Sequence, residues 1–172
     1  MTAGGVLTSS RDTVAIVTGG SRGIGRELAR ELAGRAYAIV VVYLDDQSSA
    51  EAIVEEIIGA HGAAVAVRAD IADELDVERL FAETIAAFGG VDVVAHTTVR
   101  GGAVLYQHAA RQLRRGAAIV SASTTEAITP VLAEDLQEHG ITVNGVPPGL
   151  EPAGAGHDLA DLVGLLDRWR DG

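Results

Sequence analysis

The sequence predicts an α/β protein built on a doubly wound, mostly parallel sheet of six strands. Short apolar runs alternate along the chain with segments whose apolar residues recur at helical spacing. Strands that are apolar on both faces are typical of a parallel sheet covered by helices on each side. The expected strands are residues 13–18, 38–43, 64–69, 91–96, 117–122 and 141–146.

The length of the chain fits one domain. A chain of 172 residues can bury a core of ordinary size without disulfides or metal ions. We therefore expect a single domain over residues 12–172 and a loose tail over residues 1–11.

The first two helices are indicated by spacing and by capping residues. Ile24, Leu28 and Leu32, four residues apart, predict a helix after the first strand. Ser48, with Glu51 three residues later, predicts a capping box for the second helix. The residues expected on the buried face of that helix are Ile53, Ile57 and Ile58.

The third helix has both of its ends marked. Asp73 is the expected N-cap, and Gly89 and Gly90 end the helix. Its expected buried face is Val77, Leu80, Phe81, Ile85 and Phe88. Shorter helices are expected at about 103–115 and 130–139. A last amphipathic helix over 158–170 is expected to bury Leu159, Leu162, Val163, Leu166 and Trp169.

Composition excludes several classes of function. There is no cysteine, which excludes disulfides, thiolate metal sites and cysteine nucleophiles. The net charge is -11 and the 13 basic residues are all arginine, which argues against a nucleic-acid partner. No apolar run approaches the ~18 residues that span a bilayer, so we expect a cytoplasmic protein with no membrane contact. The histidines lack metal-ligand spacing, and no metal is expected.

The stretch TGGSRGIG, residues 18–25, lies between the first strand and the first helix. Gly19, Gly23 and Gly25 let the backbone approach a pyrophosphate closely, and the helix N-terminus then faces the negative charge. This context predicts a dinucleotide site, although a purely structural turn would use glycines in the same way.

Several segments, in order, resemble the short-chain dehydrogenase/reductase family. The turn beginning at Thr18 matches the family's T-G-x-x-x-G-x-G, AVRADIAD its third strand, VDVVAHTT its fourth, AAIVSASTT its serine strand and GITVNGVPPG its sixth. The resemblance implies a Rossmann-like fold, an NAD(P) cofactor, a small-molecule substrate and a homo-oligomer. The cofactor-binding residues that it implies are Gly19, Ser21, Arg22, Gly23, Ile24, Gly25, Tyr43, Asp70, Ile71, Thr97, Pro148 and Gly149.

The choice between the two nicotinamide cofactors depends on opposing charges. Arg22 lies where NADP-preferring members of the family carry a basic residue for the 2′-phosphate, which favours NADP(H). Asp45 and Asp46, after the second strand, would repel that phosphate or bind a free ribose hydroxyl, so NAD(H) stays open.

The proton-handling part of the family's site is missing from this sequence. The family's Tyr-x-x-x-Lys motif is absent, since the chain has no lysine and no tyrosine after residue 106. The segment from Glu126 resembles the distal half of the helix that normally carries this motif, as if its first half were deleted. The family's N-N-A-G is replaced by the four residues 96–99, His-Thr-Thr-Val.

Three residues are candidates for catalysis. Thr124 matches the family's serine, and Ser123 lies beside it. His96, at the end of the fourth strand, has an ordinary pKa near 6.5 that suits proton transfer. The alternative for His96 is a polar residue that is hydrogen-bonded at a strand end.

Three functions fit these observations. The first is an NAD(P)-binding enzyme that works without the Tyr–Lys relay, a natural-product tailoring enzyme for example, and that reduces an activated substrate or catalyses an isomerisation, cyclisation or elimination. The second is a non-catalytic NAD(P)-binding protein or partner subunit. The third is an NADPH-dependent ketoreductase that takes its acid from a partner or from the substrate.

Overall fold

A computed structural model describes residues 13–98, 101–121 and 130–145, together with Leu159, Val163, Gly164 and Leu166. In this part of the chain the strands are β1 Thr13–Thr18, β2 Tyr37–Tyr43, β3 Ala64–Arg68, β4 Val93–His96, β5 Ala118–Ser121 and β6 Thr142–Gly145. The helices are α1 Gly23–Gly34, α2 Gln47–Gly59, α3 Glu74–Phe88, α4 Gly102–Gln112 and α5 Pro130–Glu138. The expected tail over residues 1–11 lies outside the described residues.

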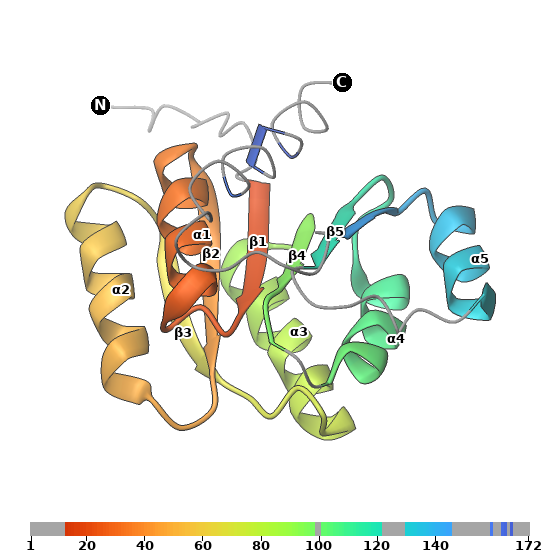
Figure 1. The fold of residues 1–172 in the computed structure, drawn as a ribbon, viewed down its shortest axis with the longest axis horizontal. Coiled ribbons are helices and arrows are strands. Elements are labelled where there is room, and N and C mark those ends of the chain that lie inside the picture. The colour runs from red at the N-terminus through yellow and green to blue at the C-terminus, as the bar shows by residue number, and fades with distance from the viewer. Residues whose placement is uncertain are drawn as a thin grey trace, which may run out of the picture.

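The strands form one parallel sheet in the order β3-β2-β1-β4-β5-β6 (Figure 1). The predicted doubly wound sheet is confirmed. The order reverses between β1 and β4, and the last residues of these strands, Thr18 and His96, are partners in register. Ligands of such sheets bind beyond the carboxyl ends of the strands, near the point of reversal.

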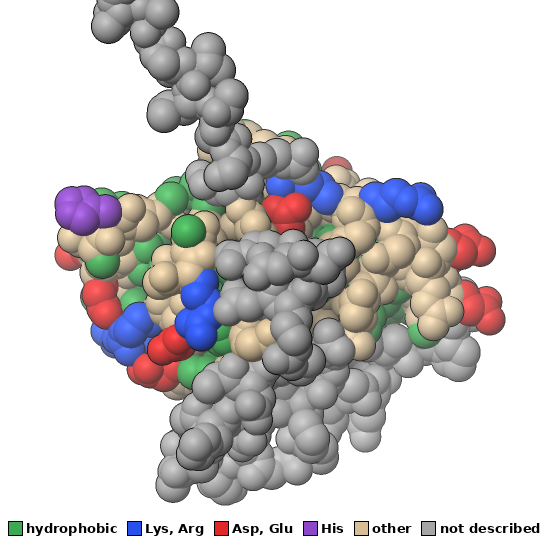
Figure 2. All heavy atoms as spheres, turned by 90° about the horizontal axis from the view of Figure 1, so that it is seen from above, with side chains coloured by type: hydrophobic (Ala, Val, Ile, Leu, Met, Phe, Trp, Pro, Cys, Tyr) green, Lys and Arg blue, Asp and Glu red, His purple; other side chains and the backbone are tan. Residues whose placement is uncertain are grey.

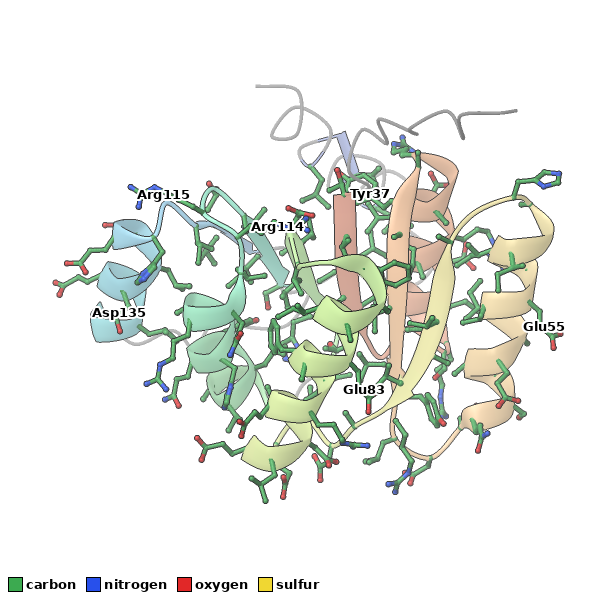
Figure 3. All side chains as sticks on the ribbon, turned by 180° about the vertical axis from the view of Figure 1, so that it is seen from behind. Tyr37, Glu55, Glu83, Arg114, Arg115 and Asp135 are labelled. Atoms are coloured by element: carbon green, nitrogen blue, oxygen red, sulfur yellow. The ribbon has the colours of Figure 1, made fainter. Side chains whose placement is uncertain are left out.

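Helices cover both faces of the sheet, as the continuous apolar runs predicted. On one face, α1 and α2 pack with Leu159, Val163 and Leu166 on alternate strand residues such as Ala15 and Val17. On the other face, α3, α4 and α5 pack on Ile16 and its neighbours (Figures 1 and 3). Burial on both faces explains why the strands are rich in valine and isoleucine.

The limits of α3 agree with the prediction, but one of its predicted buried residues is wrong. The Asp73 side chain accepts a hydrogen bond from the Asp76 N–H, and Gly89 ends the helix at φ +85°. Ile85 is 37% exposed, whereas Thr84 is buried. The Thr84 hydroxyl donates to the Leu80 carbonyl over 2.8 Å. Because that bond satisfies the hydroxyl, threonine can take the inward position.

The predicted start of α2 and one of its buried residues are also wrong. Asp46, and not Ser48, is the N-cap, and its carboxylate accepts from the Ser49 N–H at 3.1 Å. A carboxylate at this position also interacts favourably with the positive end of the helix dipole, which a serine hydroxyl does less well. The helix therefore begins at Gln47, and Ile58 is 54% exposed.

The position of this cap can be tested by two alanine substitutions. We expect Asp46→Ala to lower the urea midpoint of unfolding, because the Ser49 N–H loses its acceptor. Ser48→Ala should leave the midpoint almost unchanged, since the Ser48 hydroxyl only donates to Asp46 from an exposed position. Equal shifts in the two variants would contradict the assignment of Asp46 as the cap.

The edge of the sheet at which the strands begin is held by a partly buried ion pair. Arg114 Nη1 lies 2.6 Å from Asp92 Oδ2, and that oxygen also accepts the Val14 N–H at 2.9 Å. Figure 3 shows Arg114 at this edge, and Figure 2 looks down onto it, with arginine and acidic side chains next to one another. The pair thus joins the start of β1 to the segments that lead into β4 and β5.

None of the helices in the described residues is long and apolar enough to cross a bilayer.

Candidate functional site

A cavity of about 560 Å³ opens at the carboxyl edge of the sheet. Its walls come from the β1–α1 turn, the end of β2 with the loop after it, the β3–α3 loop and the residues after β4. This is the place where a doubly wound sheet binds its ligand. The carboxyl ends of the strands, where this cavity opens, point to the lower side of the sheet as drawn in Figure 1.

The glycines of the β1–α1 turn are required for different reasons. Gly19 and Gly23 have φ of +64° and +58°, a region that side chains disfavour. A Cβ at Gly19 would lie 2.8 Å from Thr98 Cγ2, so this glycine also permits close packing. A Cβ at Gly23 would meet nothing within 4 Å, because Gly23 faces open space beside the cavity.

Gly25 lies behind the turn and holds it against α1. A Cβ there would overlap the Gly19 carbonyl, with its carbon at 2.7 Å, and would lie 2.8 Å from Thr97 Oγ1. Gly25 is buried in the first turn of α1 and does not line the cavity. Its function in the site is therefore to let α1 approach the turn, so that the helix N-terminus points at the cavity.

Thr97 ties the end of β4 to the end of β1. Its hydroxyl donates to the Thr18 carbonyl at 2.6 Å, and its N–H donates to Thr18 Oγ1 at 3.1 Å. These bonds extend the β1–β4 pairing by one residue and bring Thr97 and Thr98 to the cavity wall. Thr98 was not among the residues predicted from the sequence, although its place after a strand end was a usable signal.

His96 is 1% exposed and is held between β1 and α4. Its Nδ1 lies 2.9 Å from Thr18 Oγ1, and the ring of Tyr106 packs edge-on with its centroid 5.6 Å away. The Thr18 hydroxyl also accepts the Thr97 N–H, so His96 and Thr97 are both hydrogen-bonded to the end of β1. Burial lowers the pKa of His96 to about 4, so the ring is neutral at pH 7.

This geometry matches the alternative that the sequence left open for His96, a hydrogen-bonded histidine at a strand end. His96 does not line the cavity. A catalytic function for His96 stays a prediction.

Titration of His96 should make folding stability depend on pH. The unfolded state binds a proton near pH 6.5 and the folded state only near pH 4, so stability is complete above pH 6.5 and falls as the pH drops toward 4. We expect a loss of up to roughly 3 kcal/mol across this window. Urea unfolding of the wild type and of His96→Gln at pH 4.5 and pH 7 measures it. If the free energy of unfolding depends on pH equally in both proteins, the lowered pKa of His96 is contradicted.

The wall opposite the glycine turn is shaped by Asp70. Its Oδ1 accepts the Ala72 N–H at 2.9 Å, and its own N–H donates to Asp76 Oδ2 at 2.8 Å. The Asp70 N–H, together with Arg79, holds the pKa of Asp76 below its usual range. Asp70 and Ile71 are therefore presented to the cavity by a hydrogen-bonded loop.

Arg22 lies at the mouth of the cavity as the N-cap residue of α1. Its side chain is 72% exposed, and Nη2 lies 3.8 Å from Asp46 Oδ2. Both residues line the cavity, so the opposing charges noted in the sequence meet in space.

The structure brings most of the predicted cofactor residues together. Those that line the cavity are Gly19, Ser21, Arg22, Gly23, Ile24, Tyr43, Asp70, Ile71 and Thr97. Thr124, Ser123, Pro148 and Gly149 lie outside the described residues. Lining residues that the prediction missed include Val42, Leu44, Ala69 and Ala72, each within two residues of a predicted one. In the described part of the chain, no group of three or more acidic or histidine side chains is placed to hold a metal ion.

The fold and this cleft define a nucleotide-binding α/β domain, and comparison with known proteins identifies its family. Residues 13–115 match the family model for short chain dehydrogenases. The chain is 31% identical to a hydroxynaphthalene reductase-like protein of Metarhizium majus, over 79% of this chain and 67% of that protein. It is also 31% identical to a 3-oxoacyl-acyl-carrier-protein reductase of Staphylococcus aureus, over 78% of this chain and 73% of that protein. The chain belongs to the short-chain dehydrogenase family.

Solved structures agree with this assignment. A short chain dehydrogenase from Burkholderia cenocepacia in complex with NADP superposes with a TM-score of 0.71 and 30% identity, covering 86% of this chain and 80% of that one. A blue fluorescent protein from a metagenomic library, in complex with NADPH, superposes with a TM-score of 0.69 and 28% identity, covering 80% of this chain and 74% of that one. The Rossmann-like fold expected from the resemblance is confirmed.

Proposed function

We propose that this protein binds NADP(H) in the cavity at the carboxyl edge of the sheet and reduces an activated carbonyl substrate. The observation that carries the proposal is the cavity itself, which joins the glycine turn to the wall formed by Asp70 and Ile71. Two structural relatives, in complex with NADP and NADPH, support the choice of cofactor.

The residues present fit a dinucleotide. Gly23 leaves open space at the turn, where a side chain would stand between the backbone and a phosphate. The N-terminus of α1, where the Arg22 side chain forms no capping hydrogen bond, would supply N–H groups to a pyrophosphate, and Arg22 offers a cation at the ribose. The Asp70 loop closes the adenine end.

An activated substrate fits the residues that this sequence lacks. NADPH, when bound, supplies a hydride to the carbonyl carbon, and the carbonyl oxygen then needs a proton. Without a Tyr–Lys relay, that proton comes from water or from the substrate, and the loss of a general acid typically costs about 10²–10⁴-fold in rate. Thr124 and Ser123 are the hydroxyls proposed to hold the carbonyl oxygen.

The names of the relatives suggest which substrates to test. One relative is named for hydroxynaphthalenes and another for 3-oxoacyl thioesters. We expect quinone-like or 1,2-dicarbonyl aromatic compounds to be reduced faster than simple ketones, because their carbonyl carbons are more electrophilic.

The experiment combines binding with turnover. NADPH binding is measured by calorimetry, and its oxidation is followed by absorbance with an activated aromatic dicarbonyl, a 3-oxoacyl thioester and a simple ketone. Binding with oxidation of the activated compound alone supports the proposal. Absence of binding by either NADPH or NADH would refute the assignment of the cavity.

A second candidate is a non-catalytic NADP-binding protein or partner subunit. It is favoured by the absence of lysine from the sequence and by the burial of His96, which does not line the cavity. Binding of NADPH without oxidation across the whole panel would favour this candidate. A non-redox reaction would show as conversion of substrate without consumption of NADPH.

A further inference from the structure

The cavity ends at β4. Among the described residues, its lining comes from the ends of β1, β2, β3 and β4 and the residues that follow them, and none comes from β5, β6 or α4. A doubly wound sheet holds a dinucleotide across the crevice at its point of reversal, with one nucleotide on each half of the sheet. The point of reversal here lies between β1 and β4. The second nucleotide of such a ligand must therefore extend past the end of β4, toward β5.

Thr98 stands at this crossing. Thr97, the residue before it, is tied to Thr18 by two hydrogen bonds, so the chain leaves β4 in a fixed direction. The Thr98 side chain packs on the glycine turn, since a Cβ added at Gly19 would lie 2.8 Å from Thr98 Cγ2. Thr98 is half-buried, and both it and Gly19 line the cavity. The branched side chain of Thr98 therefore takes up space between the glycine turn and the end of β4.

The chain around Thr98 has little room to withdraw and widen the crossing. Gly101, which precedes α4, has φ +83°, and a Cβ there would lie 2.7 Å from Ile71 Cγ1 and 2.8 Å from the Ile71 carbonyl. Gly101 is thus in close contact with the wall opposite the glycine turn. Because Thr98 contacts Gly19 and Gly101 contacts that wall, a shift of this segment would overlap one side of the cavity or the other.

We propose that Thr98 is a specificity-determining residue, whose branched side chain limits how far a bound nucleotide extends from the cavity toward β5. This inference rests on the proposed function, because it assumes that the adenosine half of NADP(H) binds in the cavity. The glycine turn and the wall of Asp70 and Ile71 hold that half, and the nicotinamide half, which has to pass Thr98, adds little to the affinity. A smaller side chain at residue 98 makes room for the second half.

The test compares, by calorimetry, NADPH with adenosine 2′-phosphate 5′-diphosphate, the fragment that lacks the second ribose and the nicotinamide. Thr98→Ala should raise the ratio of NADPH affinity to fragment affinity roughly five- to tenfold, since it removes both branches of the side chain from the crossing. Thr98→Ser, which removes only the methyl group, should raise the ratio by a smaller factor. Thr98→Val keeps the branched shape without the hydroxyl, and its ratio should equal that of the wild type.

Thr97→Ser is the matched control. Thr97 lines the same cavity and also loses one methyl group, while serine keeps a hydroxyl for the Thr18 carbonyl, which lies 2.6 Å from Thr97 Oγ1. We expect the ratio of this variant to match that of the wild type, because Thr97 is held behind the turn, against β1 and Gly25. Circular dichroism melts of all four variants check that the fold is intact.

The outcomes separate the two levels of inference. If the fragment fails to bind the wild type, the assignment of the cavity to the adenosine half fails. If the fragment binds, and Thr98→Ala and Thr98→Ser leave the ratio unchanged, the cavity assignment stands and the limiting function of Thr98 is refuted. An equal rise of the ratio in Thr98→Val or in Thr97→Ser refutes it as well, because the gain would then not depend on the size of the side chain at the crossing.

Discussion

Gly25→Ala is expected to weaken nucleotide binding strongly and to destabilise the fold. The added methyl group would overlap the Gly19 carbonyl and would also lie 2.8 Å from Thr97 Oγ1. Both neighbours are fixed, the first by the turn and the second by its hydrogen bond to Thr18, so α1 itself must shift. Overpacking of this kind costs about 3 kcal/mol at its upper end. The same free energy, lost from nucleotide binding, corresponds to roughly a 100-fold loss of affinity.

Gly34→Ala is the control for this prediction. Gly34 lies in the last turn of the same helix, is exposed, and leaves open space for a methyl group. Alanine there should be neutral or stabilising by up to about 1 kcal/mol. Urea unfolding and calorimetry with NADPH measure both effects. Gly25→Ala binding NADPH with wild-type affinity would contradict the packing described for the turn.

At the edge of the sheet where the strands begin, opposite the cavity, Asp92→Ala is expected to be the most destabilising substitution. The substitution leaves the Arg114 guanidinium, 17% exposed, without its carboxylate, and leaves the Val14 N–H without its acceptor. Breaking one partner of a buried pair costs about 3–5 kcal/mol, and the lower value is expected here because the pair is partly hydrated. The substitution is far from the cavity, so the affinity for NADPH of the folded fraction should stay the same.

An exposed ion pair provides the comparison. Glu31 on α1 and Arg35 just after the helix have Oε2 and Nη1 2.9 Å apart, a distance similar to that of the partly buried pair, but their side chains are 48% and 34% exposed. Glu31→Ala should cost less than about 0.5 kcal/mol. Asp92→Asn, which keeps an acceptor for Val14, should fall between the two. Equal urea midpoints for Asp92→Ala and Glu31→Ala would refute the structural function of the Asp92–Arg114 pair.

The features that the sequence predicted well are those encoded by neighbouring residues. Between their terminal threonines and tyrosines, β1 and β2 consist of valine, isoleucine and alanine, and both are inner strands of the sheet buried on two faces. Asp73 and Gly89 mark the ends of α3 because capping is a local interaction. The glycine turn was recognisable because its position between strand and helix is visible in the sequence.

The features that the sequence could not supply depend on residues far apart in the chain. The low pKa of His96 results from burial by Tyr106 and by β1, 78 residues away. Asp46 displaced Ser48 as the cap because two acceptors competed, and spacing does not rank them. The Asp92–Arg114 pair joins residues that each precede a strand, a signal that has meaning only once β4 and β5 are known to be neighbours.

The pairing of β1 with β4 also has a consequence for how the protein folds. Thr18 and Thr97 are 79 residues apart, whereas β1 and β2, and likewise β2 and β3, are partners that follow one another in the chain. Closing so long a loop is entropically costly, which makes this pairing slow to form. Until it does, the glycine turn lacks the Thr97 and Thr98 wall against which Gly19 and Gly25 pack. The protein should therefore become competent to bind its nucleotide late in folding, when the two halves of the sheet join.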